Sequence, residues 1–168
     1  MLCKIDVQIV KLDHILQEIK LIDDNFLKNR VLSINENNCQ YSRSLSGDIA
    51  HSRRVIQISH LSKIALEILK NKLLKISNFE DIVIVLSPAI AVVKNIRASL
   101  IPYVPESEIE LGIISELLGC ILIDASQVGG YTINFKIANE EAVHLLNEAS
   151  LTAEQSIKKI YPNIPNYQ

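Results

Sequence analysis

The stretch SINENNC, residues 33–39, separates two long amphipathic segments of this 168-residue chain. On both sides an apolar residue returns every three or four positions, whereas residues 35–38 are four consecutive polar side chains, NENN. Asparagine side chains compete with helical backbone hydrogen bonds and favour caps and turns. The stretch therefore predicts the turn of a helical hairpin. One continuous helix with a polar patch is the alternative, because asparagine is only mildly unfavourable inside a helix.

The segment before the turn has the spacing of a coiled-coil stripe. Its apolar residues lie three and four positions apart in alternation, as in a helix that packs along a partner. They are Leu2, Ile5, Ile9, Leu12, Leu16 and Ile19, followed by Ile22, Phe26 or Leu27, and Ile34. We expect one helix from about residue 2 to residue 36.

The segment after the turn is also apolar at helical spacing, from Tyr41 to Ile76. Gly47 and several serines make this pattern less regular. We expect a second helix over about 40–77, antiparallel to the first because the connection between them is short. The predicted hairpin spans residues 2–77, and each helix covers the apolar stripe of the other.

Shorter helices are expected over residues 79–127. The run FEDIVIVL, residues 79–86, favours a helix because no second strand is evident to pair with it. Ser87 and Pro88 have the form of an N-cap followed by proline at the first helical position, which predicts a new helix reaching Leu100. A further helix opens at Glu106 or Ser107 and extends to about residue 127.

The last part of the chain predicts a linker and one more helix. Gly129 and Gly130 are expected to end the preceding helix, and residues 128–138 are interpreted as an extended linker. Asn139 is expected to cap a final helix over 139–161, with two glutamates in its first turn and two lysines in its last. The fold class is therefore all-α: one domain over 1–168, with a long antiparallel helical hairpin and shorter helices packed on it.

The composition supports helix packing in a reducing compartment. Hydrophobic residues make up 48% of the chain but aromatic residues only 5%, and tryptophan is absent, which suits helices better than a β-sandwich. The three cysteines are far apart and form no CxxC motif, so thiols are expected. No signal peptide is expected, and the most apolar run, residues 82–93, is too short and too polar at its centre to span a bilayer.

Charge is distributed unevenly along the chain. Residues 1–80 hold 12 Lys and Arg against 9 Asp and Glu, a net charge of +3, whereas residues 81–168 hold 5 against 10, a net charge of −5. The basic half is suited to an anionic surface, and the acidic half to folding back on it or to meeting a neighbouring copy.

The sequence predicts no catalytic residue, no cofactor and no metal site. The four histidines, at 14, 51, 60 and 144, do not form a metal-ligand spacing with each other or with a cysteine. Neither GxxxxGK[ST] nor GxGxxG occurs, and the serines of SRSLSGD, residues 42–48, lack the GxSxG pattern of a nucleophile. An enzyme is therefore not expected.

The basic residues of the hairpin are the candidate contact residues for a membrane or a polymer. Near an anionic bilayer each contributes about 1 kcal/mol, while no groove-reading motif or row of stacking aromatics favours nucleic acid. The candidates are Lys4, Lys11, Lys20, Lys28, Arg30, Arg43, Arg53, Arg54, Lys63 and Lys70. Interspersed acidic residues keep the alternative open that any single one belongs to an ordinary solvated face.

Several segments resemble the ESCRT-III family of membrane-remodelling polymers, and most closely its archaeal cell-division (Cdv) branch. The resemblance is carried by residues 86–150, in particular DASQVGGYTINF at 124–135, by AEQSIKKIYPNIP at 153–165, and by DIAHSRRV and ALEIL in the second helix. It implies a non-enzymatic protein that forms filaments with itself and with paralogous subunits on membrane at the division site. It further implies a cytoplasmic, peripheral location and recruitment by a coiled-coil division protein.

One family feature is not expected in this chain. Longer relatives carry a proline-containing tail that binds the MIT domain of an AAA ATPase, and the run YPNIPNYQ after the last helix leaves little room for it. Direct ATPase binding is therefore not expected. A soluble helical adaptor or regulatory coiled-coil protein, without a membrane role, remains the alternative because it needs the same heptads and no basic surface.

Overall fold

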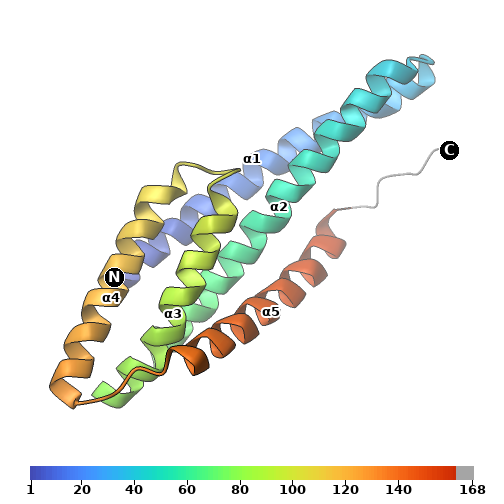
Figure 1. Ribbon diagram of the computed structural model, residues 1–168. Coiled ribbons are helices and arrows are strands. Elements are labelled where there is room, and N and C mark those ends of the chain that lie inside the picture. Colours follow the sequence, from blue (N-terminus) through green and yellow to red (C-terminus); the bar gives the residue numbers. More distant parts are fainter. Residues whose placement is uncertain (162–168) are drawn as a thin grey trace.

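The computed structural model describes residues 1–161, and in this range the chain forms helices and no strand (Figure 1). The all-α prediction is confirmed, and so is the hairpin, because the first two helices pack along each other over most of their length. The helices are α1 (Leu2–Asn35), α2 (Cys39–Leu73), α3 (Phe79–Leu100), α4 (Ser107–Gly129) and α5 (Phe135–Ile160).

The hairpin turn is made by the asparagines, as the sequence predicts. The Asn37 backbone adopts a left-handed conformation with φ of 56°, and the amides of Asn37 and Asn38 donate to the carbonyls of Ile34 and Ser33. This pairing is a Schellman motif that ends α1. The side chain of Asn38 then accepts from the amide of Tyr41 at 3.2 Å and caps α2. The continuous-helix alternative is therefore wrong.

From Leu12 to Asp23 the contact stripe of α1 follows the heptad, which corrects one predicted position in this stretch. Leu12 is fully buried, and Leu16 and Ile19 are half-buried against the partner helices. After Ile19 the next inward position is Asp23, which has no exposed surface, whereas Ile22 is 45% exposed. Continuing the alternation of three and four from residue 19 gives residue 23, so the register, and not hydrophobicity, decides which side chain is buried.

The connection between α2 and α3 is built from capping side chains. α2 ends at Leu73, four residues earlier than expected, and Asn78 caps α3 by accepting from the amide of Asp81 at 2.8 Å. The carboxylate of Asp81 accepts in turn from the amide and the hydroxyl of Ser77. These hydrogen bonds, that of the hydroxyl first, hold the pKa of Asp81 below its usual value.

The expectation that Ser87 and Pro88 start a helix is wrong. α3 runs without interruption through both residues, and Pro88 is buried inside it. The hydroxyl of Ser87 donates to the carbonyl of Val83 at 2.7 Å, one turn back, and so caps nothing. Proline has no amide hydrogen, so the carbonyl of Ile84 lacks its usual helical donor. The apolar side chains of residues 82–93 pack well enough in the bundle to keep the helix continuous.

The end of α4 confirms the expected glycine stop, while the start of α5 corrects the expected linker. Gly130 has a φ of 66°, where glycine carries no steric penalty. α5 begins at Phe135, because Asn134 accepts from the amides of Lys136 and Ile137, each at 3.2 Å. The linker is therefore shorter than the predicted 128–138, and the glutamates at 140 and 141 lie beyond the first turn. The two lysines expected in the last turn are there.

The helices form two hairpins and a covering helix (Figure 1). The second hairpin, α3 with α4, packs beside the lower half of the first, and α5 lies along α2 and α3. The apolar core fills this shared region and draws on all five helices. The far half of the α1–α2 hairpin projects beyond the other helices, so that only α1 and α2 contribute to its interior.

α3 is a strongly apolar helix whose inward face lies in the core. Its 22 residues, with a mean hydropathy of 1.6 over the best window, are by length and composition sufficient to cross a membrane. The helix is longer than the sequence suggested because it continues through Pro88. Its inward face, including Val92, Val93 and Ile96, is buried against the rest of the bundle.

Candidate interaction surfaces

Four of the ten predicted contact residues are held in ion pairs within the chain. Lys63 and Lys70 on α2 pair with carboxylates of α1, with distances of 2.5 Å to Asp13 and 2.5 Å to Asp6. These pairs are partly exposed, so each contributes at most about 1 kcal/mol. The two pairs are nevertheless regularly spaced along α1 and α2, in the antiparallel register. Each pair therefore favours the observed alignment of the two helices.

A further pair connects α1 to the second hairpin. Lys11 pairs with Glu110 in the first turn of α4. Beside it the amide nitrogen of Gln8 donates to the hydroxyl of Ser107 at 2.9 Å, and both side chains are buried. These two contacts join the start of α4 to the start of α1 and position the second hairpin against the first.

The fourth pair is buried and lies halfway along the hairpin. Asp23 on α1 has no exposed surface, and it accepts from Ser52 at 2.9 Å and from Arg53 at 3.2–3.3 Å. The side chain of Arg53 is only 20% exposed. A carboxylate removed from water requires such donors, because an isolated charge at this depth would be strongly unfavourable. Asp23, Ser52 and Arg53 are called the hairpin clamp below.

α5 rests on α2 and α3 through small side chains. Its inward positions are spaced three or four residues apart and are all nearly or fully buried. They are Ala138, Ala142, Leu145, Ala149 and Ala153. Among the ion pairs of residues 1–161, none joins α5 to the hairpin. The acidic helix therefore lies on the basic hairpin as expected, but it is held there by apolar contacts rather than by charge.

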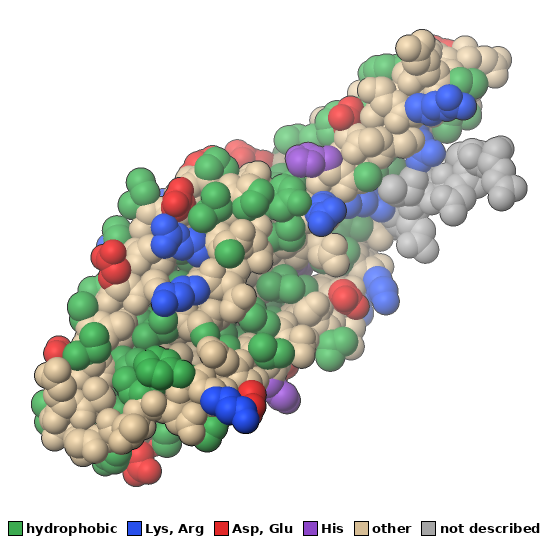
Figure 2. Space-filling view, viewed as in Figure 1, with side chains coloured by type: hydrophobic (Ala, Val, Ile, Leu, Met, Phe, Trp, Pro, Cys, Tyr) green, Lys and Arg blue, Asp and Glu red, His purple; other side chains and the backbone are tan. Residues whose placement is uncertain are grey.

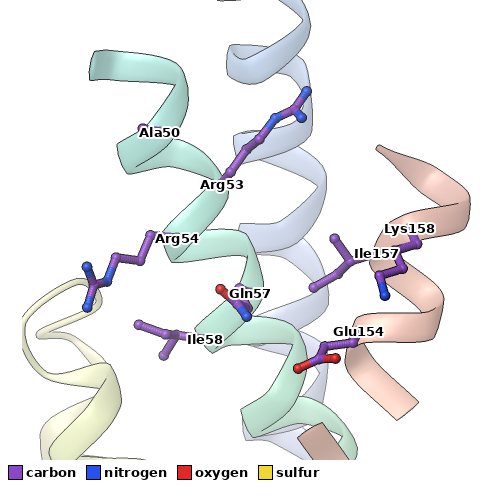
Figure 3. A pocket seen from close by; sticks show the side chains of 8 residues that line it. All are labelled: Ala50, Arg53, Arg54, Gln57, Ile58, Glu154, Ile157 and Lys158. Carbon is purple, nitrogen blue, oxygen red and sulfur yellow. The ribbon is translucent and has the colours of Figure 1, made fainter. Parts of the chain in front are cut away.

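The contact between α5 and α2 opens towards the end of α5. A cleft of about 670 Å³ lies between them there, lined by residues of both helices, and Figure 3 shows Ile157 directed from α5 towards α2. Figure 3 shows Arg53 directed towards α1 and Arg54 directed the other way, so the basic side chains of this cleft do not converge on one point. The last turns of α5 are therefore less tightly packed than its centre.

Tyr161, which follows α5, lies within the electrostatic reach of the hairpin clamp. Partial burial raises the pKa of its hydroxyl, and the negative charges of Asp23 and Asp24 raise it further. The end of α5 thus reaches the level at which the hairpin becomes uncovered. Residues 162–168, on which the expectation about ATPase binding rests, lie outside the described residues.

The described part of the chain shows no arrangement for metal chemistry. No group of three or more His, Cys, Asp or Glu side chains between residues 1 and 161 is placed to hold a metal ion. The three cysteines are exposed thiols, far apart in sequence and not joined by disulfides.

Two cell division proteins are similar in sequence to this chain. Cell division protein B1 of Sulfolobus acidocaldarius is 32% identical over 120 residues, which are 71% of this chain and 56% of that protein. Cell division protein B of the same organism is 21% identical over 163 residues, which are 97% of this chain and 62% of that protein.

This chain is a homologue of the cell division B proteins. The expected resemblance to the archaeal cell-division branch is thereby confirmed. The chain spans less than two thirds of the length of either relative. No family model matches it, and no solved structure matches it significantly.

In this cell division B homologue the remaining predicted contact residues are mostly exposed. Lys4, Lys20, Lys28, Arg43 and Arg54 present their side chains to solvent, and Arg30 is half-buried with its Nε enclosed. Lys28, Arg30 and Arg43 lie on the half of the hairpin that the other helices leave uncovered, whereas Arg54 lies beside the end of α5. The residues that sequence reasoning missed are Asp23 and Gln8, both polar, fully buried and placed on the inward stripe of α1.

Proposed function

We propose that this protein is a non-enzymatic subunit of membrane-associated filaments that act in archaeal cell division. The observation that carries the proposal is the match to Cell division protein B over 97% of the chain, together with the stronger match to Cell division protein B1. The long helical hairpin with its projecting half supports it, since such a shape offers surfaces to neighbouring subunits. Paralogous subunits are the natural partners besides a second copy.

We propose that α5 keeps the subunit in a closed state. Burying four alanines and one leucine stabilises its docking by about 5 kcal/mol at most, taking about 0.8 kcal/mol for each methyl group and about 2 kcal/mol for leucine. This docking free energy is small for a helix of 26 residues, and the cleft near Ile157 reduces the contact between α5 and α2 further. A membrane or a partner that binds the surface of α2 covered by α5 can therefore displace α5.

The exposed basic residues support a peripheral location on the cytoplasmic face of the membrane. Lys20, Lys28, Arg43 and Arg54 carry the charge that an anionic bilayer attracts. Lys11, Arg53, Lys63 and Lys70 are engaged within the chain, so they contribute less to such a surface. Recruitment by a coiled-coil division protein would add to this attraction.

Liposome sedimentation combined with electron microscopy tests the proposal. The full chain and a chain truncated before Phe135 are each mixed with vesicles containing about one third anionic lipid, at low and at high salt. We expect pelleting that falls with salt, because the attraction is screened beyond about 10 Å at 0.1 M, and more filaments from the truncated chain. A chain that remains compact and soluble in every condition would instead support the adaptor function.

A control separates charge from fold. Replacing Lys28 and Arg43 with glutamine removes two exposed charges, while replacing Lys63 and Lys70 with glutamine removes the same amount of charge from ion-paired positions. We expect the first pair to abolish vesicle binding and the second to leave most of it. Equal losses would show that the exposed hairpin surface is not the membrane contact.

A further inference from the structure

Exposed apolar side chains gather at the end of the molecule away from the hairpin turn. The start of α3, the end of α4 and the start of α5 meet at this end, and Figure 2 shows hydrophobic side chains over the starts of α3 and α5. Each of these side chains is 40–72% exposed. A group of this size is typical of a contact surface, whereas single exposed apolar residues are common. The base patch consists of Leu74, Phe79, Ile84, Val128, Tyr131, Phe135 and Ile137.

A groove with a volume of about 320 Å³ runs into the base patch between α3 and α5. Ile84 and Pro88 of α3 line it, together with Thr132 of the linker between α4 and α5 and with Ile137 and Glu141 of α5. This volume is at the lower end of the range of ligand sites in proteins. The groove is therefore large enough for one or two side chains of a partner, beside which the base patch offers further apolar contact.

The groove offers hydrogen-bond acceptors that have no donors. Glu141 is an exposed carboxylate, and it takes part in none of the ion pairs formed among residues 1–161. Pro88 has no amide hydrogen, so the carbonyl of Ile84 lacks its usual helical donor. None of the residues that line the groove is Lys or Arg. A ligand that binds here must therefore supply the donors, and a positive charge on it is favoured.

The linker beside the groove has backbone groups without partners. Residues 131–134 belong to no helix or strand, and the amide and carbonyl of Thr132 make no hydrogen bond within residues 1–161. Asn134 is extended, with φ of −94° and ψ of 93°. Extended peptides bind proteins by pairing with exposed backbone of this kind, while alternate side chains enter pockets. This arrangement favours an extended segment over a helix as the ligand.

The charge around the groove indicates which kind of partner fits. Residues 79–88 and 131–141 hold four Asp and Glu against one Lys, a net charge of −3. Such a surface opposes insertion into an anionic bilayer. It attracts a basic segment, because complementary charge brings partners together and excludes acidic ones.

We infer that the groove binds an extended segment of a partner protein in which a basic and an apolar residue lie two positions apart. Side chains at this spacing point to the same side of an extended chain, so both enter the groove together. The basic group donates to Glu141 and to the carbonyl of Ile84, and the apolar side chain contacts Ile137. Arginine suits these two acceptors better than lysine, because its planar group donates in several fixed directions. The inference goes beyond the proposed filament function and does not depend on it.

A bound segment would hold α5 in its place. The groove is lined by α3 and α5 together, so it exists only while α5 rests on α3. A ligand that binds only this arrangement stabilises it by mass action. Hydrogen exchange of the α5 amides should therefore slow at least threefold when the groove is saturated.

Three pools of fluorescein-labelled octapeptides are the probes for this inference. The first pool has arginine fixed at the fourth position and leucine at the sixth, with mixed neutral residues elsewhere. The second pool has glutamate in place of the arginine, and the third has serine in place of the leucine. Fluorescence anisotropy with up to about 200 µM of the full chain suits a contact of this small size. We expect the first pool to bind at least tenfold more tightly than the second and at least threefold more tightly than the third.

Variants of the chain show whether the groove is the binding site. Glu141→Gln should weaken binding of the first pool about fivefold, as expected for the loss of a partly exposed ion pair. The control Glu140→Gln removes the same charge from an exposed position that does not line the groove, and it should change binding less than twofold. Pro88→Ala gives the carbonyl of Ile84 a donor within α3 and should weaken binding about threefold. Circular dichroism checks the fold of this variant because Pro88 is buried, and the two glutamate variants decide the matter without it.

Five results would overturn the inference. The first three are equal binding of the three pools, equal losses in Glu141→Gln and Glu140→Gln, and α5 hydrogen exchange that the first pool leaves unchanged. Displacement of the bound pool by vesicles with about one third anionic lipid would assign the groove to a membrane. Self-association of the unmodified chain in sedimentation equilibrium, lost in Glu141→Gln, would assign it to a second copy.

The filament function and the groove can fail separately. Filaments on vesicles, without any preference among the peptide pools, would leave the proposed function intact and reject the inference. A preference for the first pool that depends on Glu141, without filaments on any vesicle, would support the inference and reject the filament function.

Discussion

Removing the carboxylate of the hairpin clamp tests how the projecting half of the hairpin is held together. In Asp23→Ala, Ser52 and Arg53 lose an acceptor that lies fully out of water, at 2.9 Å and 3.2–3.3 Å respectively. Breaking a buried ion pair by removing one partner costs about 3–5 kcal/mol. Arg53 is 20% exposed and regains some hydration, so we expect a loss near the lower limit, about 3 kcal/mol. For a chain of this length the melting temperature should fall by about 6–12 °C.

Urea denaturation followed by circular dichroism measures this loss, and the neighbouring residue provides the control. Asp24 is an exposed carboxylate, so Asp24→Ala should change the free energy of unfolding by less than about 0.5 kcal/mol. The double variant Asp23→Leu with Arg53→Leu should recover most of the loss, because apolar replacement of a buried pair is often neutral. If Asp23→Ala and Asp24→Ala have equal stabilities, the clamp does not stabilise the hairpin and the reasoning is wrong.

Three further predictions concern the helix caps and the seat of α5. Asn38→Ala removes the cap on the Tyr41 amide and should lower the free energy of unfolding by about 1 kcal/mol in urea; an unchanged midpoint would show that the turn does not need it. Ala149→Leu overfills the α5 contact and should cost about 1–3 kcal/mol, visible as faster tryptic cleavage within α5; a rate equal to that of the unmodified chain would contradict the close packing. In Asp81→Asn the destabilisation should be present at about pH 6 and should shrink as the pH falls below 3.8, because the pKa of Asp81 is lower in the folded chain than the ordinary 3.8 and its contribution is lost as the pH falls through the folded value. A pH-independent difference in urea midpoints would contradict that linkage.

The hairpin could be predicted because local and long-range signals agree on it. The polar run at residues 35–38 is a turn signal, and the apolar stripe of α1 shows which face a partner must cover. The final stop of α4 was equally clear, since Gly130 adopts the left-handed conformation that glycine permits. In each case the residue type and the backbone conformation are directly linked, and no distant contact is needed to decide the outcome.

The predicted helix boundaries were wrong where tertiary packing outweighs a local sequence signal. Ser87 and Pro88 have the form of a helix start, yet the surrounding apolar residues of α3 are buried continuously, and this burial outweighs the loss of one hydrogen bond at proline. Asn139 and Asn134 are both acceptable caps by residue type. α5 uses Asn134, and Ala138, which the predicted linker would have left outside a helix, is buried beside α3 as a result.

The candidate contact residues were harder to predict, because a charge count does not show where charges find partners. Lys63 and Lys70 face α1 carboxylates only because of the antiparallel register, which places positions 13 and 6 beside them. Asp23 was overlooked because Ile22 is next to it and more apolar. Strict heptad arithmetic from Ile19 would have placed Asp23 inward, and a buried carboxylate would then have required donors on α2.

The two halves of the hairpin have different roles because different side chains hold them together. In the covered half, Ile5 and Leu12 of α1 meet Leu66 and Leu69 of α2 in a core that the other helices complete. This half keeps its own contacts if α5 is released, since α5 contributes mainly alanines. In the projecting half, the interior depends on the hairpin clamp and on few large apolar side chains. Its apolar surface lies outside, where a neighbouring subunit can cover it. In the proposed function, a subunit that releases α5 would change what it exposes without losing the hairpin, because the contacts between α1 and α2 do not depend on α5.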